Sequence, residues 1–180
     1  MKSLNNYIAE KMVFTSKTAN IKKTIKVNSL EELSNLVKMY LTNMKDKDDV
    51  LDLNHIDVSS ITSFNNLFKD KNIVNVDISR WNTENLETCD SMFEGCINLK
   101  EVNISNFNTR KLRSMAKMFK DCIELTDIGD IKYWDISELK NASWAFYFCE
   151  KLKLNITDLN LANNGVKTFN INKYTEYVKV

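Results

Sequence analysis

The feature that most constrains the fold is a repeat of 25 to 27 residues through the middle of the chain. Its copies align on a phenylalanine, and Phe68, Phe93, Phe119 and Phe146 lie 25, 26 and 27 residues apart. A near-constant period of this size is typical of solenoids, because one copy cannot bury its apolar face without a neighbour. The sequence therefore predicts stacked repeats rather than a globular enzyme.

Each copy contains two apolar patterns. Residues 74–78 and 99–104 alternate apolar and polar residues, as a short strand does. Residues 86–93 and 112–119 place apolar residues at i, i+3, i+6 and i+7, the spacing of a helix with one buried face. The predicted fold class is therefore α/β: a leucine-rich-repeat solenoid of four strand–helix repeats with a parallel sheet, capped at both ends.

The repeats occupy residues 51–153, and the two flanks are predicted to complete one folded unit. Because a stack of repeats exposes its core at each end, residues 1–50 are expected to form an N-terminal helical cap and residues 154–180 a C-terminal cap. Within the first flank, residues 4–12 have helical spacing, and Ser29 precedes a longer helix in a capping-box pattern.

Composition narrows the class of function. Lysine plus arginine (25) nearly balances aspartate plus glutamate (24), so no overall charge directs the chain to nucleic acid or anionic membrane. No run of about 18 apolar residues predicts a membrane span, and no signal-peptide pattern opens the chain. The expected location is cytoplasmic for the sequence as written, or surface or secreted if its N-terminus was trimmed.

Three motifs carry a family resemblance. Phe-x-x-Cys-x-x-Leu and Trp/Phe-Asn-Thr stand in register within residues 81–99 and 107–125, and Met-x-x-Met-Phe occurs at residues 115–119, where the earlier copy has Cys89 in the first position. In these motifs the repeats resemble the BspA-like leucine-rich repeat family of bacterial surface proteins. The resemblance implies a leucine-rich-repeat fold, binding to a protein or host surface, no enzymatic activity and no catalytic residues.

Cys96, Cys122 and Cys149 each follow an anchor phenylalanine by three residues. Stacking is expected to place them in a column about 5 Å apart. Buried free thiols are the favoured interpretation, and a disulfide or a metal site are the alternatives. Structural zinc needs four converging ligands, and the only histidine, His55, lies in the first copy, so neither metal nor cofactor is predicted.

The third copy has a basic cluster of Arg110, Lys111, Arg113, Lys117 and Lys120, which could bind nucleic acid. In the register of the repeats, three of these residues lie opposite glutamates of the preceding copy, which predicts ion pairs that neutralise the cluster. The predicted pairs are Arg110 with Glu84, Arg113 with Glu87 and Lys120 with Glu94. Nucleic-acid binding through Arg110, Lys111 and Arg113 is the alternative.

The fourth copy has aromatic residues where the earlier copies have polar ones: Trp144, Tyr147 and Phe148. Either residues 154–180 cover this patch, or it is exposed and docks a partner or, in a weak dimer, a second copy of the chain.

The strands alternate, so their polar residues are expected to point outward from the sheet. A rigid polar sheet face is a typical recognition surface of stacked repeats, although it could also be merely solvated. The candidate partner-binding residues on this face are Asp77, Ser79, Glu101, Asn103, Ser105, Asp130 and Lys132.

The sequence thus predicts a non-enzymatic protein-binding module, adhesin-like by resemblance, which acts through the sheet face or the aromatic fourth copy. No motif combines a nucleophile, a base and an orienting group, so no catalytic residue is predicted. The alternative is a small intracellular inhibitor, encoded by a phage or mobile element, that blocks a host enzyme or ribonucleoprotein.

Overall fold

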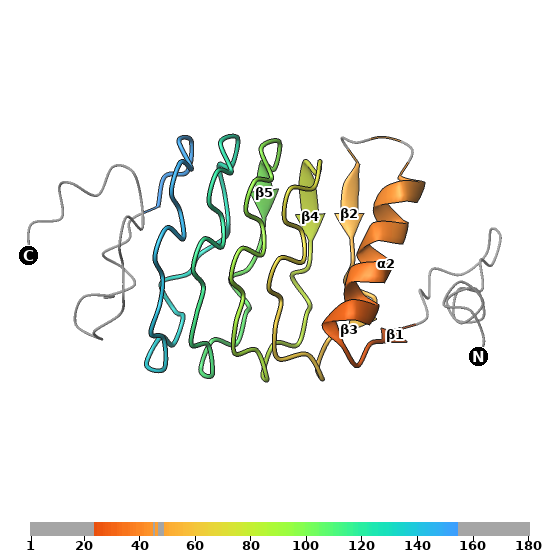
Figure 1. Ribbon diagram of the computed structural model, residues 1–180, viewed down its shortest axis with the longest axis horizontal. Coiled ribbons are helices and arrows are strands. Elements are labelled where there is room, and N and C mark those ends of the chain that lie inside the picture. The colour runs from red at the N-terminus through yellow and green to blue at the C-terminus, as the bar shows by residue number, and fades with distance from the viewer. Residues whose placement is uncertain (1–23, 45, 47–48, 155–180) are drawn as a thin grey trace, which may run out of the picture.

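The computed structural model describes residues 24–44, 46 and 49–154 (Figure 1). These residues contain one helix, α2 (Leu30–Asn43), and five short strands. All strand pairs are parallel: β1 lies beside β3, and the second sheet has the order β2-β4-β5. The strands are β1 (Ile25–Lys26), β2 (Val50–Asp52), β3 (Ile56–Asp57), β4 (Asn75–Asp77) and β5 (Glu101–Val102).

Successive repeats of the chain lie side by side in sequence order, starting next to α2 at one end (Figure 1). On one side, Asn75 of β4 is in register with Glu101 of β5, and an isolated bridge continues this row to Asp127. On the other side, isolated parallel bridges connect the repeats at Ser63, Thr88, Ser114 and Asn141. The repeats are therefore held together on both sides by parallel backbone pairing.

The predicted fold class, a solenoid of four strand–helix leucine-rich repeats, is wrong. Within the described residues the only helix is α2, which precedes the repeats. Residues 86–93 and 112–119, which were predicted to be helical, instead form turns and isolated bridges. The strand that a fourth strand–helix repeat requires is reduced to one bridge at Asp127. The repeats are built from short parallel strands and turns.

Left-handed backbone explains why the predicted helices do not form. In the first repeat Leu67 N donates to Phe64 O at 3.1 Å, and the third residue of this turn, Asn66, has a φ of 59°. A left-handed third residue is the mark of a type II turn, and it cannot continue a right-handed helix. The same position is left-handed in every repeat, at Asn66, Ser91, Lys117 and Trp144, as is the position four residues later, at Asp70, Gly95, Asp121 and Phe148.

The amides of alternate residues in these turns bond to the next repeat. Phe93 N donates to Met118 O and Phe119 N to Ala145 O, both at 2.8 Å. Because buried backbone groups must be paired, these bonds replace the i to i−4 bonds that a helix would have made. The turn segments are therefore stable only in contact with a neighbouring repeat.

The anchor phenylalanines stack in one buried column, as the repeat period implies. The centroids of the successive rings of Phe68, Phe93, Phe119 and Phe146 are 4.9, 5.2 and 5.8 Å apart, and neighbouring rings are within 11° of parallel. All four side chains are buried. Apolar side chains spaced three or four residues apart thus reach the core from a chain of turns, as they would from a helix.

Helix α2 begins where the capping box predicts. Ser29 Oγ accepts from Glu32 N at 3.1 Å, and the Glu32 carboxylate accepts from Asn28 N at 2.9 Å. The helix lies beside β2 at the end of the row (Figure 1) and buries Leu33, Leu36 and Val37 in the common core. In the part of the chain that the structure describes, no helix is long and apolar enough to cross a membrane. Residues 4–12 and 155–180, which were predicted to form a helix and most of a cap, lie outside the described residues.

Candidate functional site

The outward face of β2, β4 and β5 forms an open groove of about 710 Å³. Alternation along the strands produces it: Val76 and Val102 point their side chains into the core, and the residues on either side of them point outward. Four of the predicted site residues lie in this groove: Asp77, Ser79, Glu101 and Asn103. The groove is also lined by Val50, Asn75, Val76, Lys100, Val102, Asp127 and Gly129.

Two of these site residues have structural partners that the sequence did not reveal. Asp77 Oδ1 accepts from Ser79 N at 3.1 Å and from Ser79 Oγ at 2.7 Å. One repeat later, Asn103 Oδ1 accepts from Ser105 N at 3.0 Å and from Ser105 Oγ at 2.6 Å. Such turns end a strand by pairing a side-chain oxygen with the backbone amide two residues on. Asp77 and Asn103 therefore fix the shape of the face as well as lining it.

The pKa of Asp77 lies below its ordinary value. Burial is the largest influence and raises the pKa, but hydrogen bonds from Asn54 and Ser79 together outweigh it, even though the neighbouring Asp52 also raises it. A carboxylate that accepts hydrogen bonds is stabilised in its charged form. Asp77 is therefore negatively charged at neutral pH.

Asp130 and Lys132 lie outside the residues that line the groove. Lys132 Nζ is 2.7 Å from Asp130 Oδ2, and Lys132 N donates to Asp130 Oδ1 at 3.1 Å. The fourth repeat has one extra residue here. Gly129 follows Asp127 two residues on, as Asn103 follows Glu101 in the third repeat. The sequence alignment therefore missed Asp127 as the groove residue, and the Asp-x-Gly pattern was the signal that could have found it.

The aromatic residues of the fourth repeat lie away from the groove lining. Trp144, Tyr147 and Phe148 are half-buried; the rings of Tyr147 and Phe148 meet edge to face, with centroids 4.4 Å apart. Lys117 Nζ of the preceding repeat lies 5.7 Å from the centroid of the Trp144 ring. These residues therefore form a second cluster, in which Tyr147 contacts Phe148 and Trp144 contacts Lys117.

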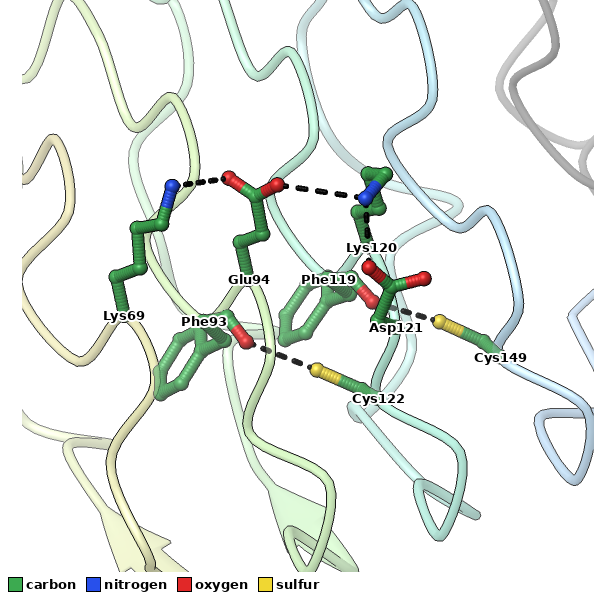
Figure 2. A network of polar contacts seen from close by, with 8 residues as sticks. All are labelled: Lys69, Phe93, Glu94, Phe119, Lys120, Asp121, Cys122 and Cys149. Carbon is green, nitrogen blue, oxygen red and sulfur yellow. Dashed lines mark hydrogen bonds and ion pairs between the residues drawn. The ribbon is translucent and has the colours of Figure 1, made fainter.

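Two of the three predicted charge pairs are confirmed. Lys120 Nζ lies 3.5 Å from a Glu94 oxygen, and Lys69 Nζ lies 3.0 Å from the other oxygen, so Glu94 links three repeats (Figure 2). Arg113 is 3.5 Å from Glu87, with both side chains largely exposed. The predicted pair of Arg110 with Glu84 is not among the ion pairs of the described residues. Arg110 and Lys111 bond to amide side chains instead: Arg110 Nε donates to Asn108 Oδ1 at 3.4 Å and Lys111 Nζ to Asn85 Oδ1 at 2.7 Å.

The cysteine column is buried, and its three thiols are free. Each thiol donates to the carbonyl of the anchor phenylalanine one repeat earlier, as Figure 2 shows for Cys122 and Cys149, at 3.0 and 2.9 Å. Burial raises the pKa of Cys96 and Cys149 to about 12 and that of Cys122 further still. Protonated, inaccessible thiols are poor nucleophiles, so the column contributes to packing. Across the described residues, no group of three or more His, Cys, Asp or Glu side chains could hold a metal ion.

His55 joins the first repeat to α2. Its Nε2 atom is 2.5 Å from Tyr40 Oη, and the two rings meet edge to face with centroids 5.2 Å apart. Burial, followed by the charge of Asp52, raises the pKa of Tyr40, so the phenol stays protonated and able to donate. The histidine thus contributes to the packing of the helix against the repeats.

Comparison with known proteins identifies a family. A family model described as "Mycoplasma protein of unknown function, DUF285" matches residues 9–102, 33–159 and 90–177. These overlapping matches are what an internal repeat produces, and the second alone covers more than half of the chain. No curated protein and no solved structure matches the sequence. The chain belongs to the DUF285 family.

Proposed function

We propose that this chain is a non-enzymatic binding module of the BspA-like type, and that its sheet groove recognises a protein partner. The observation that carries the proposal is the groove itself, which is lined mainly by polar residues on and next to β4 and β5 and by Asp127. An extended polar surface on a stack of repeats is how such proteins commonly bind macromolecules.

The rigidity of the face supports this role. Each strand is paired with its neighbour, and the phenylalanine column packs in the core of the repeats. Turns at Asp77 and Asn103 fix the ends of the strands. A preorganised surface loses little conformational entropy when a partner binds. This favours the groove over the aromatic cluster, whose side chains already pack on one another and on Lys117.

The proposal includes no catalytic step. The four cysteines are buried, and His55 contacts Tyr40 away from the groove. The BspA-like resemblance favours an adhesin-like role at a surface. A bound host enzyme or ribonucleoprotein would instead favour the inhibitor role.

Blocking the groove tests the proposal. Asn75 lies at the start of the central strand β4, so Asn75→Trp places a bulky ring in the groove whatever the chemistry of the partner. The matched control is Glu84→Trp, at an exposed position outside the groove lining. The full chain and both variants would be used to capture partners from cells of the native host, and the melting temperature of each would be recorded.

We expect Asn75→Trp to lose a partner that the parent and Glu84→Trp both retain, with little change in melting temperature. A third variant, Trp144→Ala, tests the rival surface. If Asn75→Trp kept the partner while a folded Trp144→Ala lost it, the fourth repeat would replace the groove as the recognition surface.

A further inference from the structure

Like charges face one another on the sheet groove. Glu101 and Asp127 are register partners on neighbouring strand segments, and both side chains are exposed. A second pair of register partners, Asp52 and Asp77, lies two residues further along the strands, and of these two Asp77 lines the groove. Like charges directly opposite each other destabilise a sheet, and such local conflicts tend to occur at functional sites. A cationic ligand would remove this repulsion.

The acidity is local to the groove. Its lining contains the carboxylates of Asp77, Glu101 and Asp127 and a single ammonium group, that of Lys100. The whole chain, by contrast, has a formal net charge of +1. A negative patch on a chain that is slightly positive overall attracts a cationic partner to one face and gives the encounter an orientation.

The backbone holds these charges in place. Asp127 Oδ1 accepts from Gly129 N at 2.7 Å, in the same kind of turn that Asp77 makes with Ser79. Gly129 has a φ of 78°, and a Cβ there would lie 2.5 Å from Asn103 Oδ1. A side chain at this position would therefore be strained and would collide with the lining, so glycine keeps this part of the groove open.

We propose that the groove docks its protein partner through lysine or arginine side chains of that partner. This inference rests on the proposed function and adds the chemistry of the bound surface. The groove is much larger than an ion, and the described residues contain no set of three metal-binding side chains. Val50 is 57% exposed at its rim and offers an apolar contact for the aliphatic stem of a long basic side chain.

The probe is a short synthetic peptide of alternating lysine and serine, added to the isotope-labelled full chain and followed by backbone amide chemical shifts. A peptide with glutamate in place of lysine is the control. We expect only the lysine peptide to shift the amides of residues 75–79 and 101–103, with binding that weakens as salt is added.

Matched variants separate the groove from general charge attraction. Glu101→Gln/Asp127→Asn removes two charges from the groove and is expected to weaken binding by at least about tenfold. Because it also removes the repulsion, it should melt no lower than the parent. Glu84→Gln/Glu138→Gln makes the same change in net charge at two exposed positions outside the groove lining, and is expected to bind like the parent.

Equal weakening in both double variants would overturn the inference, because the attraction would then be non-specific. It would also fall if calcium chloride alone shifted the same amides and displaced the peptide, since the face would then be a metal site. If Asn75→Trp abolished capture of the native partner while Glu101→Gln/Asp127→Asn left that capture intact, the proposed function would stand without the cationic chemistry. Capture that survived Asn75→Trp would refute the proposed function itself.

Discussion

The left-handed turns predict an unusual order of stability for two substitutions at Lys117. This residue has a φ of 57° and lies within the segment that the sequence predicted as a helix. A left-handed backbone costs a residue with a Cβ roughly 1–2 kcal/mol. The greater freedom of glycine in the unfolded chain offsets about 0.4–1 kcal/mol of this cost. Lys117→Gly should therefore be about 0.5–1 kcal/mol more stable than Lys117→Ala.

The comparison isolates the backbone. Both variants remove the ammonium group that lies 5.7 Å from the centroid of the Trp144 ring, so this loss cancels between them. The control is the same pair at Lys38, which is exposed on α2. In a helix interior glycine is about 0.8–1.0 kcal/mol less favourable than alanine, so there the order should reverse.

Urea unfolding of the four variants, monitored by circular dichroism, measures the differences. Opposite signs at the two lysines are expected. If glycine were worse than alanine at Lys117 by the same amount as at Lys38, the segment would behave as a helix, and the turn description of the repeats would be refuted.

Three further predictions concern the core and the charges. Phe119→Ala should reduce the free energy of unfolding by about 3–5 kcal/mol, because the ring is fully buried between two others, whereas Tyr133→Ala, at an 80% exposed side chain, should change it by less than about 0.5 kcal/mol. If Phe119→Ala unfolded at the same temperature as the parent, the stacked column would be contradicted. Reversing the charge of Glu87 or of Arg113 alone should destabilise the folded chain slightly, and reversing both should recover most of the loss, with a coupling of about 0.2–1 kcal/mol in a double-mutant cycle. Additive effects of the two reversals would mean that the pair contributes nothing. Burial raises the pKa of Glu94, but its hydrogen bonds and two lysine partners outweigh this and lower the pKa. The stabilisation from this carboxylate is therefore present above the unfolded pKa of about 4.3 and is lost as pH falls through the lower folded pKa. Between pH 7 and pH 3 the free energy of unfolding should decrease less for Glu94→Gln than for the parent, and equal decreases would contradict the assignment.

The sequence predicted the period and the buried side chains correctly but the backbone incorrectly. Apolar residues spaced three and four apart reach one face both of a helix and of successive type II turns, so the spacing from Leu112 to Phe119 fits either. Residue types that tolerate left-handed backbone occur at the key positions, as at Asn66 and Gly95. In the third repeat this position is Lys117, a residue type that does not indicate left-handed backbone. The bonds between repeats that decide the outcome involve residues some 26 apart, beyond any local pattern.

The candidate site was predicted in part for a similar reason. Alternation placed Asp77 and Glu101 on the outward face, and both line the groove. It also aligned Asp130 with them, because the extra residue in the fourth repeat shifts the alignment by one. Local periodicity therefore located the face, whereas pairing between strands determined that Asp127 shares it.

The central claim is that the sheet groove is the recognition surface, and the most direct test is an amide chemical-shift map of the full chain bound to a partner purified from the native host. The account predicts the largest changes at residues 75–79, 101–103 and 127–129, with small changes in the turns around Phe119. Changes centred on residues 144–148, with the groove amides unmoved, would contradict it.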